Sequence, residues 1–177
     1  MAGDDQVQGL AGDDFVDAGP GTDFIYGDGT CPAEAEDAAD CARGGSGSDI
    51  VAGGPGDDRI LAEGGDDHVS GEQGDDSIMG GPGHDRMAGG AGEDVLEGSA
   101  GDDLLLGESG ADTVTTGEGA DRVNGGSGQD VIATGPGRDI VDLRDGESDT
   151  LSCGSGADSV TADRRDSLTG CEKVRRR

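Results

Sequence analysis

The chain has 177 residues, with 40 acidic side chains against 12 Lys and Arg and a formal net charge of −28. Val, Leu, Ile and Phe together number only 28, a pairing of low apolar content with high charge that is typical of a disordered chain unless something besides hydrophobic burial holds it together. The charge argues against nucleic-acid binding, and no apolar stretch reaches the length of a transmembrane helix.

Residues 1–29 contain three irregular units, each with an aspartate followed two positions later by an aliphatic residue. The pairs are Asp5 with Val7, Asp14 with Val16, and Asp23 with Ile25. The three aromatic side chains of the protein, Phe15, Phe24 and Tyr26, lie beside these aliphatic residues. They either cover an open end of the fold or form a contact patch.

Residues 30–43 interrupt this pattern. Cys31 and Cys41 bracket a run of Ala, Glu and Asp, which are mostly good helix formers, and Pro32 suits a first helical turn. The segment therefore predicts a small excursion, closed by a disulfide between its two cysteines.

Residues 44–145 repeat with a period of nine. Eleven aspartates follow one another at this spacing: Asp49, Asp58, Asp67, Asp76, Asp85, Asp94, Asp103, Asp112, Asp121, Asp130 and Asp139. A glycine precedes each of them by two positions, and an aliphatic or methionine side chain follows each by two positions. The unit is Gly-Gly-x-Gly-x-Asp-x-aliphatic-x. Its glycines permit a tight turn over the first six positions, and its last three positions suit a short strand with one side chain pointing inward.

This unit resembles the calcium-binding nonapeptide repeat of RTX (hemolysin-type) proteins, clearest in GGPGDDRIL, GGPGHDRMA and GGSGQDVIA. The resemblance implies an all-β fold, a right-handed parallel β-roll with two repeats per coil that runs as one continuous solenoid. It also implies Ca²⁺ between stacked turns, on the order of ten ions. The implied metal ligands are carbonyl oxygens and the aspartates Asp5, Asp14, Asp23, Asp49, Asp58, Asp67, Asp76, Asp85, Asp94, Asp103, Asp112, Asp121, Asp130, Asp139, Asp149 and Asp158.

The chemistry of the repeat agrees with this interpretation. Flexible oxygen ligands favour Ca²⁺ over Mg²⁺, and since neither His nor Cys recurs in the unit, zinc and copper are disfavoured. A solvated acidic linker is the alternative, but a linker has no reason to place an aliphatic residue in every unit. Further carboxylates just before the motif aspartate are interpreted as solubilising or as hydrogen-bonding within the turn: Asp4, Asp13, Asp57, Asp66, Asp75, Glu93 and Asp102.

Residues 146–177 contain degenerate repeats and a basic end. The period slips after Asp139, and half of the Lys and Arg residues gather here: Arg164, Arg165, Lys173, Arg175, Arg176 and Arg177. A disulfide between Cys153 and Cys171 would clip the last strand into a cap. Four cysteines allow three pairings, which the sequence does not distinguish, and we favour pairing of nearest neighbours. A thiolate zinc site is disfavoured because no C-x-x-C occurs, so the cysteines indicate an oxidising, extracytoplasmic location.

An enzymatic role is not expected. His68 and His84 fit as surface variants of the repeat, and no nucleophile or metalloprotease motif occurs. Carboxylates in open turns saturated with calcium are expected to have no raised pKa for acid catalysis. Because the chain starts within a repeat and has no signal peptide, we expect a trimmed piece of a larger exported protein.

Three functions remain. The first, which we favour, is a secreted or cell-surface module that folds on binding several Ca²⁺ ions and has a structural or interaction role. The second is the non-catalytic C-terminal part of a secreted RTX hydrolase or toxin. The third is a calcium-dependent assembly or adhesion element of a surface layer or virion. Calcium ions are the expected partners, and self-association or contact with a host surface is left open.

Overall fold

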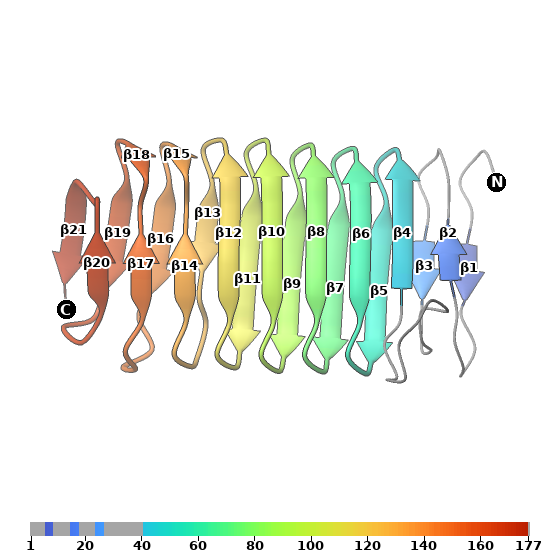
Figure 1. Ribbon diagram of the computed structural model, residues 1–177, viewed down its shortest axis with the longest axis horizontal. Helices are drawn as coiled ribbons and strands as arrows, with labels where there is room; N and C mark the ends of the chain where they lie inside the picture. Colours follow the sequence, from blue (N-terminus) through green and yellow to red (C-terminus); the bar gives the residue numbers. More distant parts are fainter. Residues whose placement is uncertain (1–5, 9–14, 18–23, 27–40, 177) are drawn as a thin grey trace.

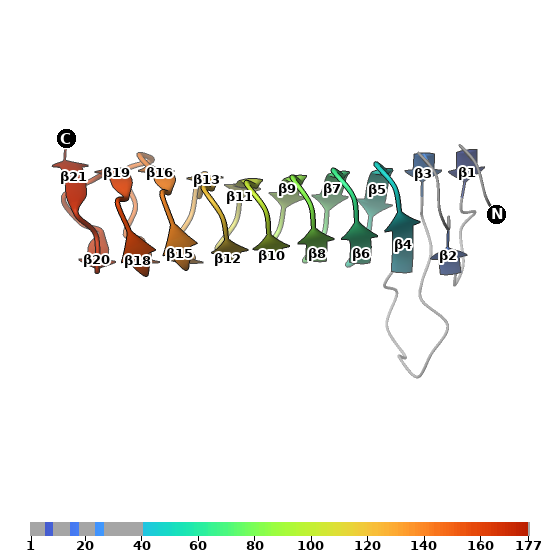
Figure 2. The same cartoon turned by 90° about the horizontal axis from the view of Figure 1, so that it is seen from above.

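The computed structural model describes residues 6–8, 15–17, 24–26 and 41–176. Of the described residues before residue 47, only the backbone is described. This part of the chain consists of strands and turns and contains no helix. The strands form two parallel sheets that face one another along the whole length, as the view from above shows (Figure 2). The all-β parallel solenoid expected from the sequence is therefore confirmed.

Within the described residues, ten strands form the first sheet. They are β1 (Gln6–Gln8), β3 (Phe24–Tyr26), β5 (Ile50–Pro55), β7 (His68–Gln73), β9 (Arg86–Ala91), β11 (Leu104–Ser109), β13 (Arg122–Asn124), β16 (Ile140–Leu143), β19 (Ser159–Ala162) and β21 (Lys173–Arg176).

Nine strands of the described chain form the second sheet. They are β2 (Phe15–Asp17), β4 (Cys41–Ser46), β6 (Arg59–Gly64), β8 (Ser77–Pro82), β10 (Val95–Ala100), β12 (Thr113–Glu118), β14 (Val131–Ala133), β17 (Thr150–Ser152) and β20 (Ser167–Thr169). The short strands β15 (Pro136–Gly137) and β18 (Ser155–Gly156) pair with one another.

Consecutive strands alternate between the two sheets, so each coil contains two repeats. The chain rises in the nearer sheet of Figure 1 and descends in the farther one while advancing toward the C-terminus, which is a right-handed coil. Strand partners are 18 residues apart in the regular part, as in the pair of Val51 with Val69. This register places every residue beside its counterpart two repeats later. Because side chains alternate direction along a strand, residues at the same repeat position then form a row on one face of the sheet.

The interruption after β3 does not disturb the stack. Ile25 pairs with Val51 across 26 residues, so eight residues are added to the usual 18 without loss of register. The strand β4 begins at Cys41, which pairs with Phe15 and Arg59, so residues 41–43 belong to the coil, not to the excursion expected for residues 30–43. Cys31 and the rest of the excursion lie outside the described residues, so the Cys31–Cys41 disulfide stays a prediction.

The core consists mainly of one column of side chains from each sheet, to which Ala62, Leu143, Cys153 and Ala162 add at the other inward position. Every aliphatic residue of the regular repeats that follows its aspartate by two positions is buried, with 0 to 4 % of its surface exposed: Val51, Ile60, Val69, Ile78, Met87, Leu96, Leu105, Val114, Val123, Ile132 and Val141. Such a narrow core gives each coil little hydrophobic stabilisation on its own.

The division of the repeat into turn and strand differs from expectation. From β5 to β12 each strand spans six residues and each turn only three, as in Gly56, Asp57 and Asp58 between β5 and β6. The expected six-residue turn and three-residue strand are wrong for these coils. The first three residues of the unit extend the strand instead: the first faces inward, and the second bends the chain with a positive φ, as in Gly81 (107°) and Gly90 (119°).

In the part of the chain that the structure describes, four residues with side chains adopt this positive φ where other repeats have glycine. They are Glu63 (77°), Glu72 (80°), Ser99 (90°) and Glu108 (74°). L-residues pay roughly 1–2 kcal/mol for this region, so these positions are strained locally.

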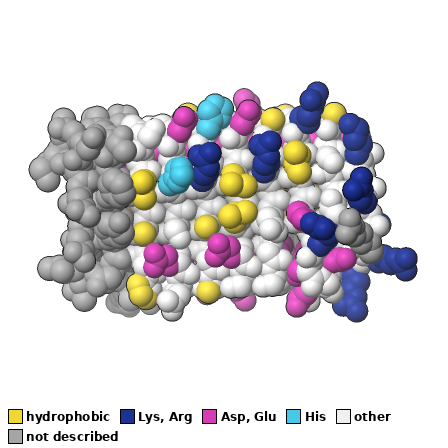
Figure 3. Space-filling model, turned by 180° about the vertical axis from the view of Figure 1, so that it is seen from behind, with side chains coloured by type: hydrophobic (Ala, Val, Ile, Leu, Met, Phe, Trp, Pro, Cys, Tyr) yellow, Lys and Arg dark blue, Asp and Glu magenta, His cyan; other side chains and the backbone are white. Residues whose placement is uncertain are grey.

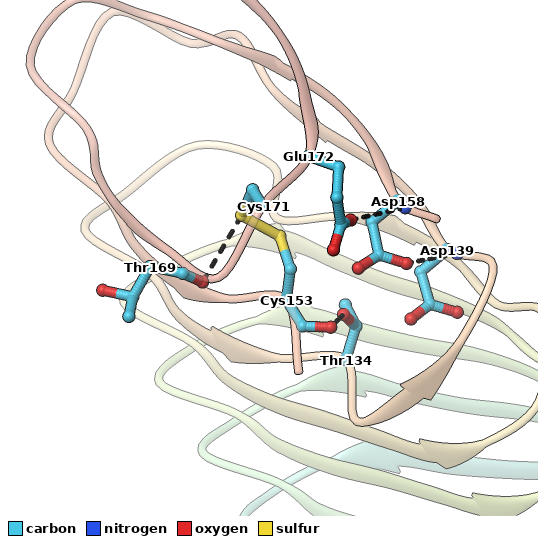
Figure 4. Close-up of a disulfide and its surroundings, with 7 residues drawn as sticks. All are labelled: Thr134, Asp139, Cys153, Asp158, Thr169, Cys171 and Glu172. Atoms are coloured by element: carbon cyan, nitrogen blue, oxygen red, sulfur yellow. Dashed lines mark hydrogen bonds between the residues drawn. A yellow bond between two sulfur atoms is a disulfide. The ribbon is translucent and has the colours of Figure 1, made fainter. Parts of the chain in front are cut away.

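The C-terminal coils depart from the nonapeptide spacing and are joined by a disulfide. Cys153 follows β17 and bonds to Cys171, with a Cα–Cα distance of 5.2 Å, which links β17 to the last turn of the chain (Figure 4). Cys153 is fully buried, and its carbonyl accepts a hydrogen bond of 3.0 Å from the hydroxyl of Thr134 one coil earlier. The expected Cys153–Cys171 pairing is confirmed.

Candidate metal centre

The motif aspartates form two ladders along the two edges of the coil. Each aspartate ends a turn, immediately before a strand, so 18-residue stacking places it above its counterpart. The first ladder precedes the first sheet, at the upper edge of Figure 1, and contains Asp49, Asp67, Asp85, Asp103, Asp121, Asp139 and Asp158. The second ladder precedes the second sheet, at the lower edge, and contains Asp58, Asp76, Asp94, Asp112, Asp130, Asp149 and Asp166.

From Asp67 to Asp158, each aspartate in the ladders is bound to its neighbours in the stack through its Oδ1 atom, its backbone N–H and its carbonyl oxygen. The carboxylate Oδ1 of Asp112 accepts a hydrogen bond of 2.9 Å from the backbone N–H of Asp94, and the N–H of Asp112 donates in turn to Oδ1 of Asp130 at 3.0 Å. The carbonyl of Asp112 accepts from the N–H of Val131 at 2.8 Å. The aspartate side chain is therefore part of the hydrogen bonding that holds successive coils together.

At most ladder positions the second carboxylate oxygen, Oδ2, has no such partner, whereas Oδ2 of Asp166 accepts a hydrogen bond of 2.6 Å from the N–H of Asp163. In the described part of the chain it is buried without a hydrogen bond at ten ladder positions: Asp67, Asp76, Asp85, Asp94, Asp103, Asp112, Asp121, Asp130, Asp139 and Asp158. A buried unsatisfied acceptor costs about 1–3 kcal/mol, and more when it is charged. Ten such atoms in a protein with so small a core require a counter-charge or a proton.

A carbonyl oxygen lies on the same side of the turn as Oδ2. A Cβ added to Gly71 would lie 2.1 Å from Oδ2 of Asp76 and 2.6 Å from the carbonyl oxygen of Gly89, in the next coil. The same arrangement recurs at Gly107, with Asp112 and the carbonyl of Gly125 at 2.3 and 2.1 Å. At Gly71 and Gly107 a side chain would therefore have to displace these oxygens, whereas Ala62, Thr116 and Thr134 fill the same repeat position in other coils.

Burial changes the acidity of the ladders. It raises the pKa of Asp67, Asp76 and Asp112 from 3.8 to about 6 and that of Asp85 to about 7, with a smaller contribution from repulsion between neighbouring carboxylates and an opposing one from the backbone hydrogen bond. These values belong to the cation-free protein, whereas the expectation of no raised pKa concerns turns saturated with calcium and stays a prediction. The turns are closed around the aspartate side chains, so the expectation that they are open is wrong.

The residues present fit a hard cation. Among the described residues no group of three or more His, Cys, Asp and Glu side chains converges on one point. A metal here would therefore take one or two carboxylates and complete its shell with carbonyl oxygens, a set that suits Ca²⁺ and does not suit zinc. The cation would neutralise the charge that burial disfavours.

An exposed ladder of side chains runs beside each of the two buried ladders. The residue before the motif aspartate accepts a hydrogen bond from the backbone N–H of its counterpart one coil later: Asp57 from Asp75 and Asp75 from Glu93, at 2.9 and 2.8 Å. On the other edge His84 continues the same pattern, since its Nδ1 accepts from the N–H of Asp102 at 2.8 Å. These side chains bond between turns, where the sequence suggested bonding within a turn.

The ladders include most of the residues that the sequence singles out. Asp149 and Asp158 lie in register with Asp130 and Asp139, although the spacing has slipped. Asp5, Asp14 and Asp23 lie outside the described residues.

Sequence reasoning missed the last acidic group of each ladder. Oδ1 of Asp166 accepts from the N–H of Asp149 at 3.3 Å, and Oε2 of Glu172 accepts from the N–H of Asp158 at 3.0 Å (Figure 4). Both could have been found, because each is followed two positions later by an aliphatic residue, Leu168 or Val174, as in the regular repeat.

The match to a known family agrees with this geometry. The RTX calcium-binding nonapeptide repeat matches in four copies, over residues 1–29, 43–78, 79–114 and 115–147. The chain therefore belongs to the RTX calcium-binding repeat family, and its repeats indicate calcium binding. No curated protein matches the chain. Among the described residues, no helix is long and apolar enough to cross a membrane.

Proposed function

We propose that this protein is a structural or interaction module outside the cytoplasm that folds when Ca²⁺ binds along its two aspartate ladders. The observation that carries the proposal is the row of buried Oδ2 atoms without a hydrogen-bond donor, from Asp67 to Asp139 and at Asp158. Each is a negative charge removed from water that only a proton or a cation can compensate.

The sites are the ladder aspartates from Asp49 to Asp139, with Asp149 and Asp158 in the irregular coils, and Asp5, Asp14 and Asp23 by the repeat pattern. Each ion would lie between consecutive turns of one ladder and link two coils. The binding free energy then becomes folding free energy, and on the order of ten ions would act cooperatively along the stack.

A location outside the cytoplasm is supported by the disulfide and by the calcium concentration that such modules need. The Cys153–Cys171 disulfide persists in oxidising compartments. Modules of this ligand type bind calcium at roughly 10⁻⁴ to 10⁻³ M in extracellular settings. A chain that is coil at cytoplasmic calcium and folded outside would be exported unfolded and would fold on arrival.

Circular dichroism during a calcium titration, beside the same titration with Mg²⁺, tests the proposal. We expect a cooperative transition from coil to β structure with Ca²⁺ alone. A full β spectrum in chelator at neutral pH, unchanged by calcium, would show that the narrow core and disulfides suffice and would overturn the proposal.

A further inference from the structure

The outer face of the first sheet has a shallow groove that the calcium ladders do not explain. The groove runs along the coil axis across β5, β7, β9 and β11 and has a volume of about 330 Å³. Its floor is a row of small, half-buried side chains, Ala52, Ser70 and Ala88, which pair in register on neighbouring strands. Leu104 and Leu106 of β11 close one end.

One wall of the groove carries cationic and hydrogen-bonding groups. Ile50, His68 and Arg86 form this wall, and Nη1 of Arg86 lies 3.2 Å from Nε2 of His68. Arg86 makes no ion pair with any residue that the structure describes. In a protein with 40 acidic residues, an exposed arginine left without a carboxylate is available to an external anion.

The carboxylates of this sheet lie elsewhere. Neither the wall row nor the floor row carries an acidic residue from β5 to β13, and Arg122 extends the wall beyond Leu104. Glu72 and Glu108 lie two residues farther along their strands, on the opposite side of the floor. Figure 3 shows His and Arg side chains on one side of the hydrophobic group and acidic side chains on the other, with further acidic side chains at the edge of the face beyond the His and Arg side chains.

We propose that this groove binds a single-chain anionic amphiphile, with its acyl chain along the small-residue floor and its phosphate against Arg86 and His68. Three strand spacings of about 4.8 Å give the groove a length of about 14 Å, which suits an extended acyl chain better than a compact ligand. Arg86 and His68 define the headgroup side of the groove, since Glu72 and Glu108 disfavour an anion on the far side of the floor. A guanidinium next to apolar surface is well matched to a phosphate headgroup.

The inference rests in one respect on the proposed function. The formal charge of −28 repels anions at long range, and on the order of ten Ca²⁺ ions would cancel about 20 of those charges. Amphiphile binding is therefore expected to need the calcium-loaded protein.

The test is calorimetric titration of the calcium-folded chain with lauroyl lysophosphatidylglycerol below its micelle concentration. We expect saturable binding of one molecule, with affinity at least about tenfold higher than for lauroyl lysophosphatidylcholine or for glycerol phosphate. Ala88→Leu fills the floor and should weaken binding about tenfold, and Arg86→Gln should remove the preference for the anionic headgroup. Both side chains point outward, so calcium-induced folding, followed by circular dichroism in the same samples, should be unchanged.

Matched variants on the second sheet serve as controls. Ala133→Leu in β14 and Arg59→Gln in β6 change the same repeat positions on the opposite face and should leave binding intact. Equal weakening by Ala133→Leu and Ala88→Leu would overturn the proposal, as would equal affinity for the headgroup alone. A concentration-dependent doubling of mass that Ala88→Leu abolishes would instead make the groove an interface between copies. Failure of calcium-induced folding would be seen separately in the dichroism and would count against the proposed function.

Discussion

Oδ1 of Asp112 accepts a hydrogen bond of 2.9 Å from the backbone N–H of Asp94, one coil earlier in the same ladder, while Oδ2 of Asp112 is buried and accepts none. One oxygen of the carboxylate thus fixes the register between coils, and the other is left for a counter-ion. This separation of roles within one side chain makes several outcomes testable.

Replacing the charge at a ladder position should affect the calcium-bound and calcium-free proteins in opposite directions. Asp94→Asn keeps an Oδ1 acceptor for the N–H of Asp76, which donates at 2.8 Å, but removes the buried charge. We expect a higher calcium midpoint in a dichroism titration and greater stability without calcium. Asp75→Asn, in the exposed ladder, is the matched control and should change neither by much. Equal shifts for the two variants would contradict the assignment of buried aspartates as ligands.

Without calcium, the stability of the fold should depend on pH in the direction set by the raised pKa values. The folded-state pKa of Asp85 is about 7 and that of Asp149 about 6, against 3.8 in the ordinary carboxyl group. The folded state therefore binds more protons than the unfolded state, and this extra proton binding stabilises the fold. The stabilisation is complete below about pH 4 and is lost as pH rises through about 6 to 7. Calcium-free protein should gain β structure on acidification from about pH 8 to about pH 5. A loss of β structure over that range would contradict the burial of these carboxylates.

Removing a side chain from a strained backbone position should stabilise the protein. Glu108 has a φ of 74°, which glycine adopts freely, so Glu108→Gly should raise the free energy of unfolding by about 1 kcal/mol. Glu97→Gly is the control, because Glu97 lies in β10 without a positive φ, and it should lower stability by up to about 1 kcal/mol. Chemical denaturation at saturating calcium measures the free energy of unfolding of both variants. If Glu108→Gly lowered it as well, the contacts of the Glu108 side chain would outweigh the strain of its backbone conformation.

A methyl group at the first glycine of a repeat should disturb the metal site. In Gly89→Ala the new Cβ would lie 2.3 Å from Oδ2 of Asp94, so a coil has to shift, at a cost of about 1–3 kcal/mol. We expect a higher calcium midpoint and a lower melting temperature. Gly64→Ala is the comparison, since the nearest atom to its Cβ is the carbonyl oxygen of Pro82 at 3.8 Å, and it should be tolerated.

Breaking the C-terminal disulfide should destabilise the last coils. Cys153 and Cys171 are 18 residues apart, and closing a loop of that size contributes about 3 kcal/mol. The double variant Cys153→Ala, Cys171→Ala should melt at a lower temperature than the parent chain, with hydrogen exchange accelerated first in β17 to β21. Uniform acceleration along the whole stack would show that the bond stabilises all coils together.

Much of the regular coil could be predicted from sequence because its signals are local and repeated. The aspartate and the aliphatic residue two positions later mark the turn edge and the inward column, and the structure buries both at every regular unit from Asp49 to Val141. The residues at the C-terminal end were harder to assign. Asp166 and Glu172 extend the ladders across spacings of 17 and 14 residues, so the fixed interval no longer marks them, and the aliphatic residue two positions later is the sequence signal that remains.

The sequence by itself determined the nine-residue period, the inward column and most of the ladder residues, because each follows from a residue type recurring at a fixed interval. The high charge and the few apolar residues indicated the need for a cation. Only the tertiary structure decided which carboxylate oxygen is satisfied and which is not, since that depends on the N–H group 18 residues away. It also decided that the turn has three residues and the strand six, because the residues after the inward position still pair with their counterparts one coil away. The groove on the first sheet likewise forms only when Ala52, Ser70 and Ala88, far apart in sequence, are stacked side by side.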